Sequence, residues 1–154
     1  EKIVMPFSML LNIVGSSNAK TKDVLWKFIK KFHMEIEPKN HRILDELTNY
    51  AINYFVDEVE PKKKFKKPNE KEKKALENLI DVLKKVPQNT PAEEIQTKIY
   101  TAGKENGYSD SLRDWFKLIY EVCFGEQNGP RMGFFISFFG VKETIDLMEK
   151  KLRI

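Results

Sequence analysis

The sequence predicts an all-α protein: a bundle or cage of about eight helices, in two lobes joined by a lysine-rich loop. Lys, Glu, Leu and Ile are its frequent residues and it has only seven glycines, a composition that favours helices. In most segments apolar residues recur at three- and four-residue spacing, which is the pattern of a helix with one buried face. No segment alternates between apolar and polar residues as a half-buried strand would.

Size and composition bound the class of protein. With 154 residues the chain forms one domain, or two small lobes that share a core. Apolar residues make up 41% and charged residues 32%, as in a globular protein rather than a disordered one. No apolar run approaches the roughly 20 residues that cross a bilayer, so we interpret MPFSMLLNIVG as a buried helix and expect no membrane partner. Because residue 1 is Glu rather than Met, we expect a piece of a longer chain.

The first lobe, residues 1–60, is predicted to hold three helices. The first runs from Pro6 to about Ser16, and the second follows a cap at Thr21. A longer third helix ends near Glu58 because a proline follows shortly after. The buried face expected on the second helix consists of Val24, Leu25, Phe28, Ile29 and Phe32. On the third helix it consists of Ile43, Leu44, Leu47, Tyr50, Ala51, Tyr54 and Phe55.

Residues 61–68 are predicted to link the lobes, and they open the strongest shift in composition. Eight lysines fall within PKKKFKKPNEKEKK, residues 61–74. Such a run can lie along a phosphate backbone. It can equally be a solvated loop whose charge Glu70 and Glu72 partly offset. Phe65 inside the run is a candidate for contact with a partner, or for anchoring the loop to the core.

The second lobe, residues 69–154, begins with a clear helix signal. Asn69 followed three residues later by Glu72 predicts a reciprocal cap at the start of a helix, which Pro87 ends. The inward side of this helix is expected to consist of Ala75, Leu76, Leu79, Ile80 and Leu83.

The next helix is predicted from the sequence TPAEE. We expect Thr90 to cap it, Pro91 to take its first position and Glu93 to reach back to the amide of the cap. Asn106 and Gly107 are expected to stop it.

The sequence SDSLRD opens a further helix, which Gly125 ends. Its buried side is expected to consist of Leu112, Trp115, Phe116, Ile119 and Cys123. Two shorter helices are predicted to follow, from about Pro130 to Phe139 and from Val141 to Leu152.

The sequence offers little for catalysis. No glycine-rich phosphate loop is present, neither G-x-G-x-x-G nor G-x-x-x-x-G-K. His33 and His41 are the only histidines, and we expect them to be solvated or to cap helices rather than to bind metal. Cys123 lies on an apolar helix face, where a buried and inert thiol is expected. We therefore expect no catalytic residue, cofactor or metal in this chain, and a reducing, cytoplasmic setting.

The segment GEQNGPRMGFFISFFG, residues 125–140, is dense in phenylalanine. On a helix that starts at its proline, Arg131, Phe134 and Phe138 share one face. A guanidinium beside two rings is a surface on which unpaired bases stack, at about 1–3 kcal/mol per base. Alternatively, neighbouring helices bury this helix on two sides. The core stripe is expected to consist of Met132, Phe135, Ile136 and Phe139.

Three segments resemble the C-terminal region of class I lysyl-tRNA synthetases, the form found in archaea and some bacteria. They are PFSMLLNIVGSSNAKTKDVLWKFI, YAINYFVDEVEPKKKFKKP and AEEIQTKIYTAGKENGYSDSLRDWFKLIYEVCFGEQNGPRMGFFISFFGVKETIDLM. The resemblance covers nearly the whole chain. Its most specific part is LRDWF, then G-x-x-x-GPR-x-G-x-F, then a final helix that begins with glycine.

The resemblance implies an all-helical, cage-like anticodon-binding region in an enzyme that attaches lysine to tRNA-Lys with ATP and Mg²⁺. The two signature motifs of class I synthetases, of HIGH type and KMSKS type, are missing from this chain. We expect both to precede residue 1 in a full-length parent, whose catalytic domain would be a second partner of this region. The piece alone is therefore expected neither to activate lysine nor to bind ATP.

Helical geometry then suggests which residues bind RNA. Arg131, Phe134 and Phe138 would stack bases. Gln127 and Asn128 would read base edges, and free backbone amides at the start of the helix that follows would donate to a phosphate or base. The residues expected to reach phosphates are Arg113, Lys117 and Lys104.

Two rival functions stay open at this stage. The chain can be a helical protein-interaction module whose exposed aromatic face docks another domain, such as the catalytic domain. A stand-alone enzyme is the other rival, and no motif of the sequence supports it.

Overall fold

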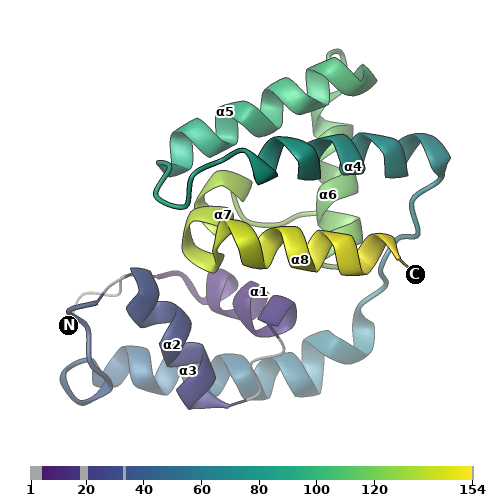
Figure 1. The fold of residues 1–154 in the computed structure, drawn as a ribbon. Helices are drawn as coiled ribbons and strands as arrows, with labels where there is room; N and C mark the ends of the chain where they lie inside the picture. Colours follow the sequence, from purple (N-terminus) through teal and green to yellow (C-terminus); the bar gives the residue numbers. More distant parts are fainter. Residues whose placement is uncertain (1–4, 18–20, 33, 154) are drawn as a thin grey trace. The chain divides into compact units, whose positions relative to one another are not determined.

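The computed structural model describes residues 5–17, 21–32 and 34–153 (Figure 1). These ranges contain eight α-helices and no strand, which confirms the prediction of an all-α protein. The chain divides into two compact units, residues 1–63 and residues 64–154. The division falls inside the lysine-rich segment. His33 and the side chain of Phe32 lie outside the described residues, so what the sequence predicted for them stays a prediction.

The first unit is built from three helices and a series of short turns. The helices are α1 (Phe7–Ser17), α2 (Lys22–Phe32) and α3 (Arg42–Tyr54). A 3-10 turn, Pro38–Asn40, precedes α3, and a π-helical turn, Phe55–Val59, and a 3-10 turn, Glu60–Lys62, follow it. Both α1 and α2 pack against α3. Helix α3 therefore does not stop abruptly before Pro61. Its α-helical geometry ends at Tyr54, and the chain continues through a π-helical and then a 3-10 turn.

The buried faces of this unit differ from the sequence prediction. On α2, Leu25 and Ile29 are buried as expected, but Trp26 joins them while Val24 and Phe28 are only half-buried. The core-facing residues of α3 and the turn after it are Leu44, Thr48, Ala51, Ile52 and Phe55. Leu44, Ala51 and Phe55 are thus buried as predicted, while Thr48 and Ile52 were not expected in this row.

Three residues placed on the buried stripe of α3 are in fact exposed. Ile43 is 50%, Tyr50 70% and Tyr54 47% exposed. They lie one helical position, about 100°, from the row that begins at Leu44. The apolar side of the helix is therefore wider than the part that α1 and α2 cover, and the sequence pattern does not reveal which row is covered.

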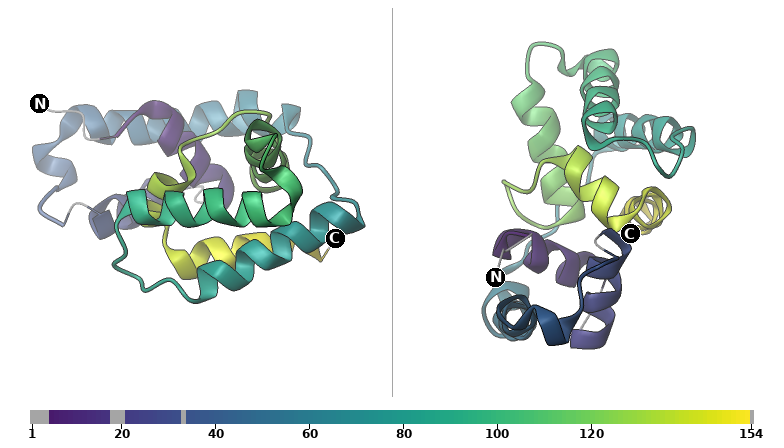
Figure 2. Two further views of the ribbon diagram at one scale, coloured as in Figure 1. Left: turned by 90° about the horizontal axis from the view of Figure 1, so that it is seen from above. Right: turned by 90° about the vertical axis from the view of Figure 1, so that its left-hand side faces the viewer.

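The second unit is built from five α-helices. They are α4 (Glu70–Lys84), α5 (Ala92–Gly103), α6 (Leu112–Cys123), α7 (Met132–Phe139) and α8 (Val141–Leu152), with a π-helical turn, Lys104–Tyr108, after α5. The short α7 packs on α5, and α8 packs on α4. Seen from above, α8 runs beside α4 (Figure 2).

Helix starts in this unit confirm one predicted cap and contradict another. Asn69 accepts from the Glu72 amide at 2.8 Å, and the Glu72 carboxylate accepts from the Asn69 amide at 3.0 Å. The predicted cap at Thr90 is wrong, because its hydroxyl donates to the carbonyl of Pro87 at 2.7 Å. Helix α5 begins one residue later than predicted, with Pro91 as its N-cap.

The helix stop predicted at Asn106 and Gly107 is confirmed. Gly107 adopts φ of +94°, a left-handed conformation that glycine takes without steric cost. The Asn106 side-chain amide donates to the carbonyl of Ala102 at 2.7 Å. This bond occupies a carbonyl in the last turn of α5, where backbone acceptors lack helical partners.

Helix α6 contributes five buried side chains to this unit: Trp115, Leu118, Ile119, Val122 and Cys123. Trp115 is fully buried, and its indole nitrogen donates to the carbonyl of Ile99 at 3.0 Å. Ile119 and Cys123 are buried as predicted. Leu112 and Phe116 were expected on the same side but are only half-buried. Phe116 therefore lies where the core of this unit meets its surface.

Candidate nucleic-acid interface

Three half-buried rings line one side of the second unit and form what we call the aromatic ridge: Tyr100, Phe116 and Tyr120. Tyr100 of α5 meets Phe116 of α6 edge to face, with ring centroids 5.0 Å apart. Tyr120, one turn further along α6, has its centroid 6.3 Å from that of Phe116. Stacking and edge contacts then continue from Tyr120 through buried Phe124 to Phe135 of α7. The ridge is thus the outer end of an aromatic series rooted in the core.

The loop between α6 and α7 is fixed to this ridge. The hydroxyl of Tyr120 donates to the carbonyl of Pro130 at 2.9 Å. Gly129 lies against the same ring, so closely that a Cβ would sit 2.5 Å from the Cδ1 atom of Tyr120. Burial raises the pKa of Tyr120, which keeps its hydroxyl protonated as a donor. Gln127 and Asn128, the predicted edge readers, are exposed on this loop.

The predicted phosphate-binding residues are all exposed and follow the ridge. Lys104 lies four residues after Tyr100. On α6, Arg113 lies three residues before Phe116, and Lys117 lies three residues before Tyr120. Residues three or four apart are neighbours on a helix. Asp110 and Asp114 are also exposed at this end of α6, so the positive charge is not uniform. The side chains nevertheless place a cation within one turn of each ring.

Arg131 is exposed and forms an ion pair with Glu93. Its Nη2 atom lies 3.0 Å from Oε2 of Glu93, and the two side chains are 55% and 79% exposed. Surface pairs of this kind contribute about 0–1 kcal/mol. A phosphate can therefore compete with Glu93 for the guanidinium at small cost. Glu93 was predicted to reach back to the cap of α5, and it reaches Arg131 instead.

The predicted face of Arg131, Phe134 and Phe138 is wrong for its last member. Phe138 is 1% exposed, and Phe134 is half-buried. Helix α7 packs against both α5 and α8, so the alternative of burial on two sides holds at Phe138. The confirmed core stripe consists of Met132, Phe135, Ile136 and Phe139. Phe138 belongs to the core and offers no stacking surface.

One amide expected to be free at the start of α7 has a partner. The backbone amide of Gly133 donates to Oε1 of Gln96, a side chain that is 5% exposed, at 2.6 Å. A Cβ at residue 133 would meet the carbonyl oxygen of Ala92. The close approach of α7 to α5 thus requires glycine at residue 133. The amide of this glycine donates to Gln96 and is therefore not free to donate to a ligand.

The sequence prediction missed Tyr100 and Tyr120. A signal was present, because tyrosine suits positions where the ring is buried and the hydroxyl reaches water or a polar partner. Tyr100 lies one residue after buried Ile99, and Tyr120 lies one residue after buried Ile119. In each case the tyrosine marks the border of a buried helical face.

Other candidate chemical groups do not contribute side chains to this surface. Cys123 is buried, and burial raises the pKa of its thiol to about 12, so the thiolate is suppressed at neutral pH. The Nδ1 atom of His41 lies 3.1 Å from the carbonyl oxygen of Glu37. Within the described residues, no group of three His, Cys, Asp or Glu side chains is placed to hold a metal ion. Among the described helices, none has both the length and the apolar character that a bilayer crossing requires.

Proteins similar to this chain are lysine–tRNA ligases. That of Rickettsia bellii strain OSU 85-389 is 40% identical over 152 residues, which are 99% of this chain and 29% of the ligase. That of Roseobacter denitrificans is 40% identical over 150 residues, 97% of this chain and 28% of the ligase. The ligase of Rickettsia rickettsii strain Sheila Smith is 38% identical over 152 residues, 99% of this chain and 29% of the ligase.

These relatives confirm the predicted resemblance to lysyl-tRNA synthetases. The chain spans less than a third of their length, since it covers 29% of the Rickettsia bellii ligase. No family model matches the chain, and no solved structure matches it.

Proposed function

We propose that this chain is the part of a lysine–tRNA ligase that holds the anticodon stem-loop of tRNA-Lys. The observation that carries the proposal is the aromatic ridge with cations one turn away, at Lys104, Arg113 and Lys117. Bases of an open loop stack on rings or guanidinium planes, while lysine and arginine neutralise the phosphates between them. Similarity to lysine–tRNA ligases supports tRNA-Lys as the RNA.

The parent enzyme is proposed to lysylate tRNA-Lys with ATP and Mg²⁺ in a class I catalytic domain outside this chain. In that scheme the chain contributes position rather than chemistry. Binding energy gained at the anticodon orients the distant acceptor end, and such orientation raises the rate without any group of this chain touching the reacting atoms. A lysine-dependent pyrophosphate exchange assay on the chain alone should therefore show no activity.

Within the anticodon loop, rings and polar groups divide the work. Lysine anticodons are rich in uridine, which offers little stacking area but a distinctive polar edge. We assign stacking to the ridge and to Phe134, and base edges to Gln127 and Asn128, which are exposed beside it. Arg131 follows these two residues closely in the chain, and we assign its guanidinium to a phosphate or to the plane of a base.

The test is binding of an RNA hairpin that carries the lysine anticodon loop, measured by fluorescence anisotropy at several salt concentrations. Affinity should fall as salt rises, because bound phosphates release counterions. Lys117→Glu should weaken binding strongly, and Phe116→Leu should cost about 1–3 kcal/mol of stacking. Lys142→Glu, a matched reversal of an exposed lysine on α8, should bind like the unaltered chain. Equal affinity of the Lys117 and Lys142 variants would refute the assigned surface.

A second candidate function rests on a different face, in the first unit. A hollow of about 480 Å³ on α3 and the turn after it is lined by exposed Tyr50 and Tyr54 and by the carboxylates of Glu46, Asp57 and Glu58. Among the described residues that line it, none is lysine or arginine. Two exposed rings among carboxylates fit a protein surface that presents lysine or arginine, such as one on the catalytic domain of the parent.

Mixing experiments separate the two functions. If the chain binds the RNA hairpin with no catalytic domain present, the RNA-binding function is supported. If it binds only the separately produced catalytic domain, and loses this with Tyr50→Ser and Tyr54→Ser, the docking function replaces it. The two functions act through different faces, so the Lys117 and Tyr50 variants should not affect each other's assay.

A further inference from the structure

The lysine-rich segment is not a loose connection where it enters the second unit. We call residues 63–69 the lysine strap. Its backbone is extended at both ends, with ψ of 134° at Lys63 and ψ of 178° at Asn69. The backbone amide of Lys66 donates to the carbonyl of Glu121 on α6 at 3.0 Å. This bond attaches the middle of the strap to α6.

Two side chains of the strap add further anchors. The ammonium of Lys66 lies 2.9 Å from Oε2 of Glu72, the residue that also caps α4. The ring of Phe65 lies under the ammonium of Lys151 on α8, which is 3.5 Å from the ring centroid. Phe65 therefore anchors the segment, although 45% of its side chain stays exposed. Two adjacent residues of the strap, Phe65 and Lys66, thus contact three helices: α4, α6 and α8.

The lysines that take no part in this anchoring are left on the surface. Lys64 and Lys67 are both exposed, and neither forms an ion pair within the described part of the chain. They are three residues apart, at most about 10 Å along an extended backbone. Lys67 lies between the anchors at Lys66 and Asn69, and Lys64 adjoins the anchored Phe65, so little backbone freedom remains to be lost when a ligand binds.

The strap also borders the loop that carries Gln127 and Asn128. A Cβ at Gly125, where that loop starts, would lie 3.4 Å from backbone atoms of Lys64 and from the ring of Phe65. Glu121, whose carbonyl accepts from the strap, lies one turn beyond Lys117 on α6. The Glu72 carboxylate accepts from Lys66, and this bond, with the negative charges of Glu72 and Glu121, holds the pKa of Lys66 above its usual value. The strap is therefore attached to α6 one turn from Lys117.

We propose that Lys64 and Lys67 of the strap form a second phosphate-backbone contact for the RNA that the aromatic ridge binds. This inference rests on the proposed function and extends it from the loop to the adjoining stem. A fixed pair of ammonium groups recognises phosphate charge and carries no sequence information. The strap thus adds affinity and orientation, and the ridge with its loop adds base selection.

The test removes both charges and follows the salt dependence of binding. Each phosphate contact contributes roughly 0.7–0.9 to the slope of log affinity against log salt. A chain with Lys64→Gln and Lys67→Gln should have a slope smaller by about 1.5, and an affinity roughly tenfold lower near physiological salt. Its loss should be equal for hairpins with the lysine anticodon and with a scrambled loop.

The matched control removes two lysines from the other end of α4. Lys84 and Lys85 are exposed there, about 20 Å from the strap along the helix. Lys84→Gln with Lys85→Gln changes the net charge equally and should leave the slope unaltered. If both double variants lower the slope equally, the effect is one of net charge and the strap contact is refuted. If neither lowers it while the unaltered chain binds RNA, the strap contact fails and the proposed function stands. If the unaltered chain binds no RNA, both fail.

Discussion

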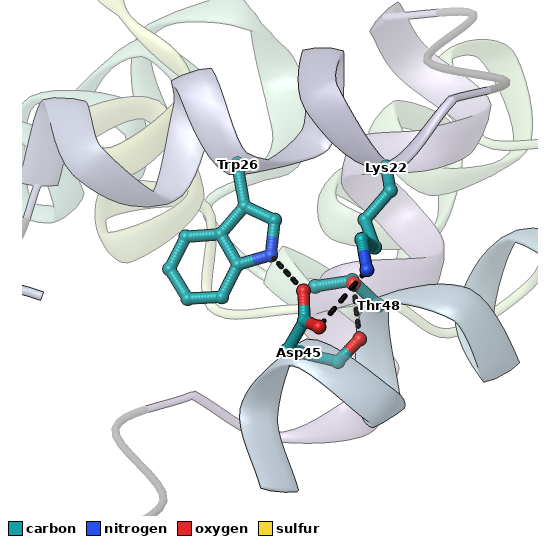
Figure 3. Close-up of polar contacts among 4 residues, drawn as sticks. All are labelled: Lys22, Trp26, Asp45 and Thr48. Carbon is teal, nitrogen blue, oxygen red and sulfur yellow. Dashed lines mark hydrogen bonds and ion pairs between the residues drawn. The ribbon is translucent and has the colours of Figure 1, made fainter. Parts of the chain in front are cut away.

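The two tryptophans of this chain are buried in different ways, one in each compact unit. In the first unit the indole nitrogen of Trp26 donates to Oδ1 of Asp45 at 2.9 Å (Figure 3). The other oxygen of this carboxylate pairs with Lys22 at 2.9 Å, and Thr48 donates to the Asp45 carbonyl. In the second unit Trp115 donates to a backbone carbonyl of α5.

This difference shows what joins the helices of each unit. In the first unit the Asp45 carboxylate joins α2 to α3 through Trp26 and Lys22, and it is 23% exposed, so water is near this junction. In the second unit the partner of Trp115 is main chain, which no substitution removes. Close glycine contacts at residues 103 and 133 bring α5 against the indole and against α7. Besides its apolar core, the first unit therefore has a replaceable polar junction between two helices, and the second has close backbone approach.

The exposed surfaces of the two units also differ. Large apolar side chains that stay exposed in the described residues are Met34, Ile43, Tyr50, Tyr54, Val56 and Phe65. Of these, only Phe65 belongs to the second unit, and the ammonium of Lys151 lies over its ring. An exposed apolar face of this kind marks a site of contact in many proteins. Within the described residues, the first unit thus exposes more large apolar side chains than the second, as the proposed docking function requires.

The largest expected effect comes from removing the tryptophan of the second unit. Trp115→Ala deletes a fully buried side chain that Gly103 touches, so it should destabilise this unit by about 3–5 kcal/mol. Urea unfolding, followed by the fluorescence of Trp26 and by circular dichroism, should show the second unit unfolding first while the Trp26 transition moves little. Parallel shifts of both transitions would show that the units are not independent.

The next largest effect is expected at the carboxylate of the first unit. Asp45→Ala leaves the indole N–H of Trp26, a side chain that is 5% exposed, without its partner. Loss of a buried hydrogen-bond partner costs about 1–3 kcal/mol. Asp45→Asn, which can still accept from the indole but loses the ion pair with Lys22, should cost less. If alanine and asparagine variants unfold at the same urea concentration, the indole bond contributes nothing.

A smaller effect with a defined pH dependence is expected at Glu72. Burial raises the pKa of this carboxyl, but hydrogen bonds from the Asn69 amide and the Lys66 ammonium outweigh it and leave the pKa below its usual 4.5. The stability it provides is therefore present above pH 4.5 and is lost as the pH falls through the lowered value.

The measurement is urea unfolding of Glu72→Ala at two pH values. At pH 7 the variant should be less stable by about 0.5–1 kcal/mol, and near pH 3 the difference should shrink. Glu77→Ala, on an exposed position of the same helix, serves as control and should show no such trend. A difference that persists unchanged at low pH would mean that the carboxylate charge is not involved.

The smallest effect on stability is expected at Arg131. Its ion-pair partner, Glu93, is highly exposed, so Arg131→Glu should change stability by no more than about 1 kcal/mol. The same variant should weaken binding of the RNA hairpin, because it places a like charge against phosphate. Melting temperature and hairpin affinity are measured together. Unfolding of the variant would mean that this arginine is structural and that the RNA surface is misplaced.

The helix set could be predicted from the sequence because its signals are local. The reciprocal cap of Asn69 and Glu72, and the stop at Gly107, depend on residues within one turn, and both were predicted. Thr90 had the same kind of signal and the prediction failed. Its hydroxyl had a competing acceptor at Pro87, which is equally close in sequence.

The candidate site was predictable only in part. The exposure of Arg113 and Lys117 followed from their places on the polar face of one helix. The ridge did not follow, since α5 and α6 bring Tyr100 to Phe116 through packing that no spacing within one helix records. From the sequence alone, the lysine-rich segment could be a solvated loop or a contact surface. Its position in the structure is fixed by α6, which contacts Lys66, and by α8, which contacts Phe65.

By itself, the sequence determined the all-α class, the order of the helices and the resemblance to lysyl-tRNA synthetases, because each rests on residue type and short-range spacing. Tertiary structure alone decided which apolar rows are covered: Phe138 is sealed in the core while Tyr50 is left in water. The physical reason is that burial depends on a second surface from a distant segment. A helix whose apolar arc is wider than any one neighbour can cover leaves that choice to the packing of the whole unit.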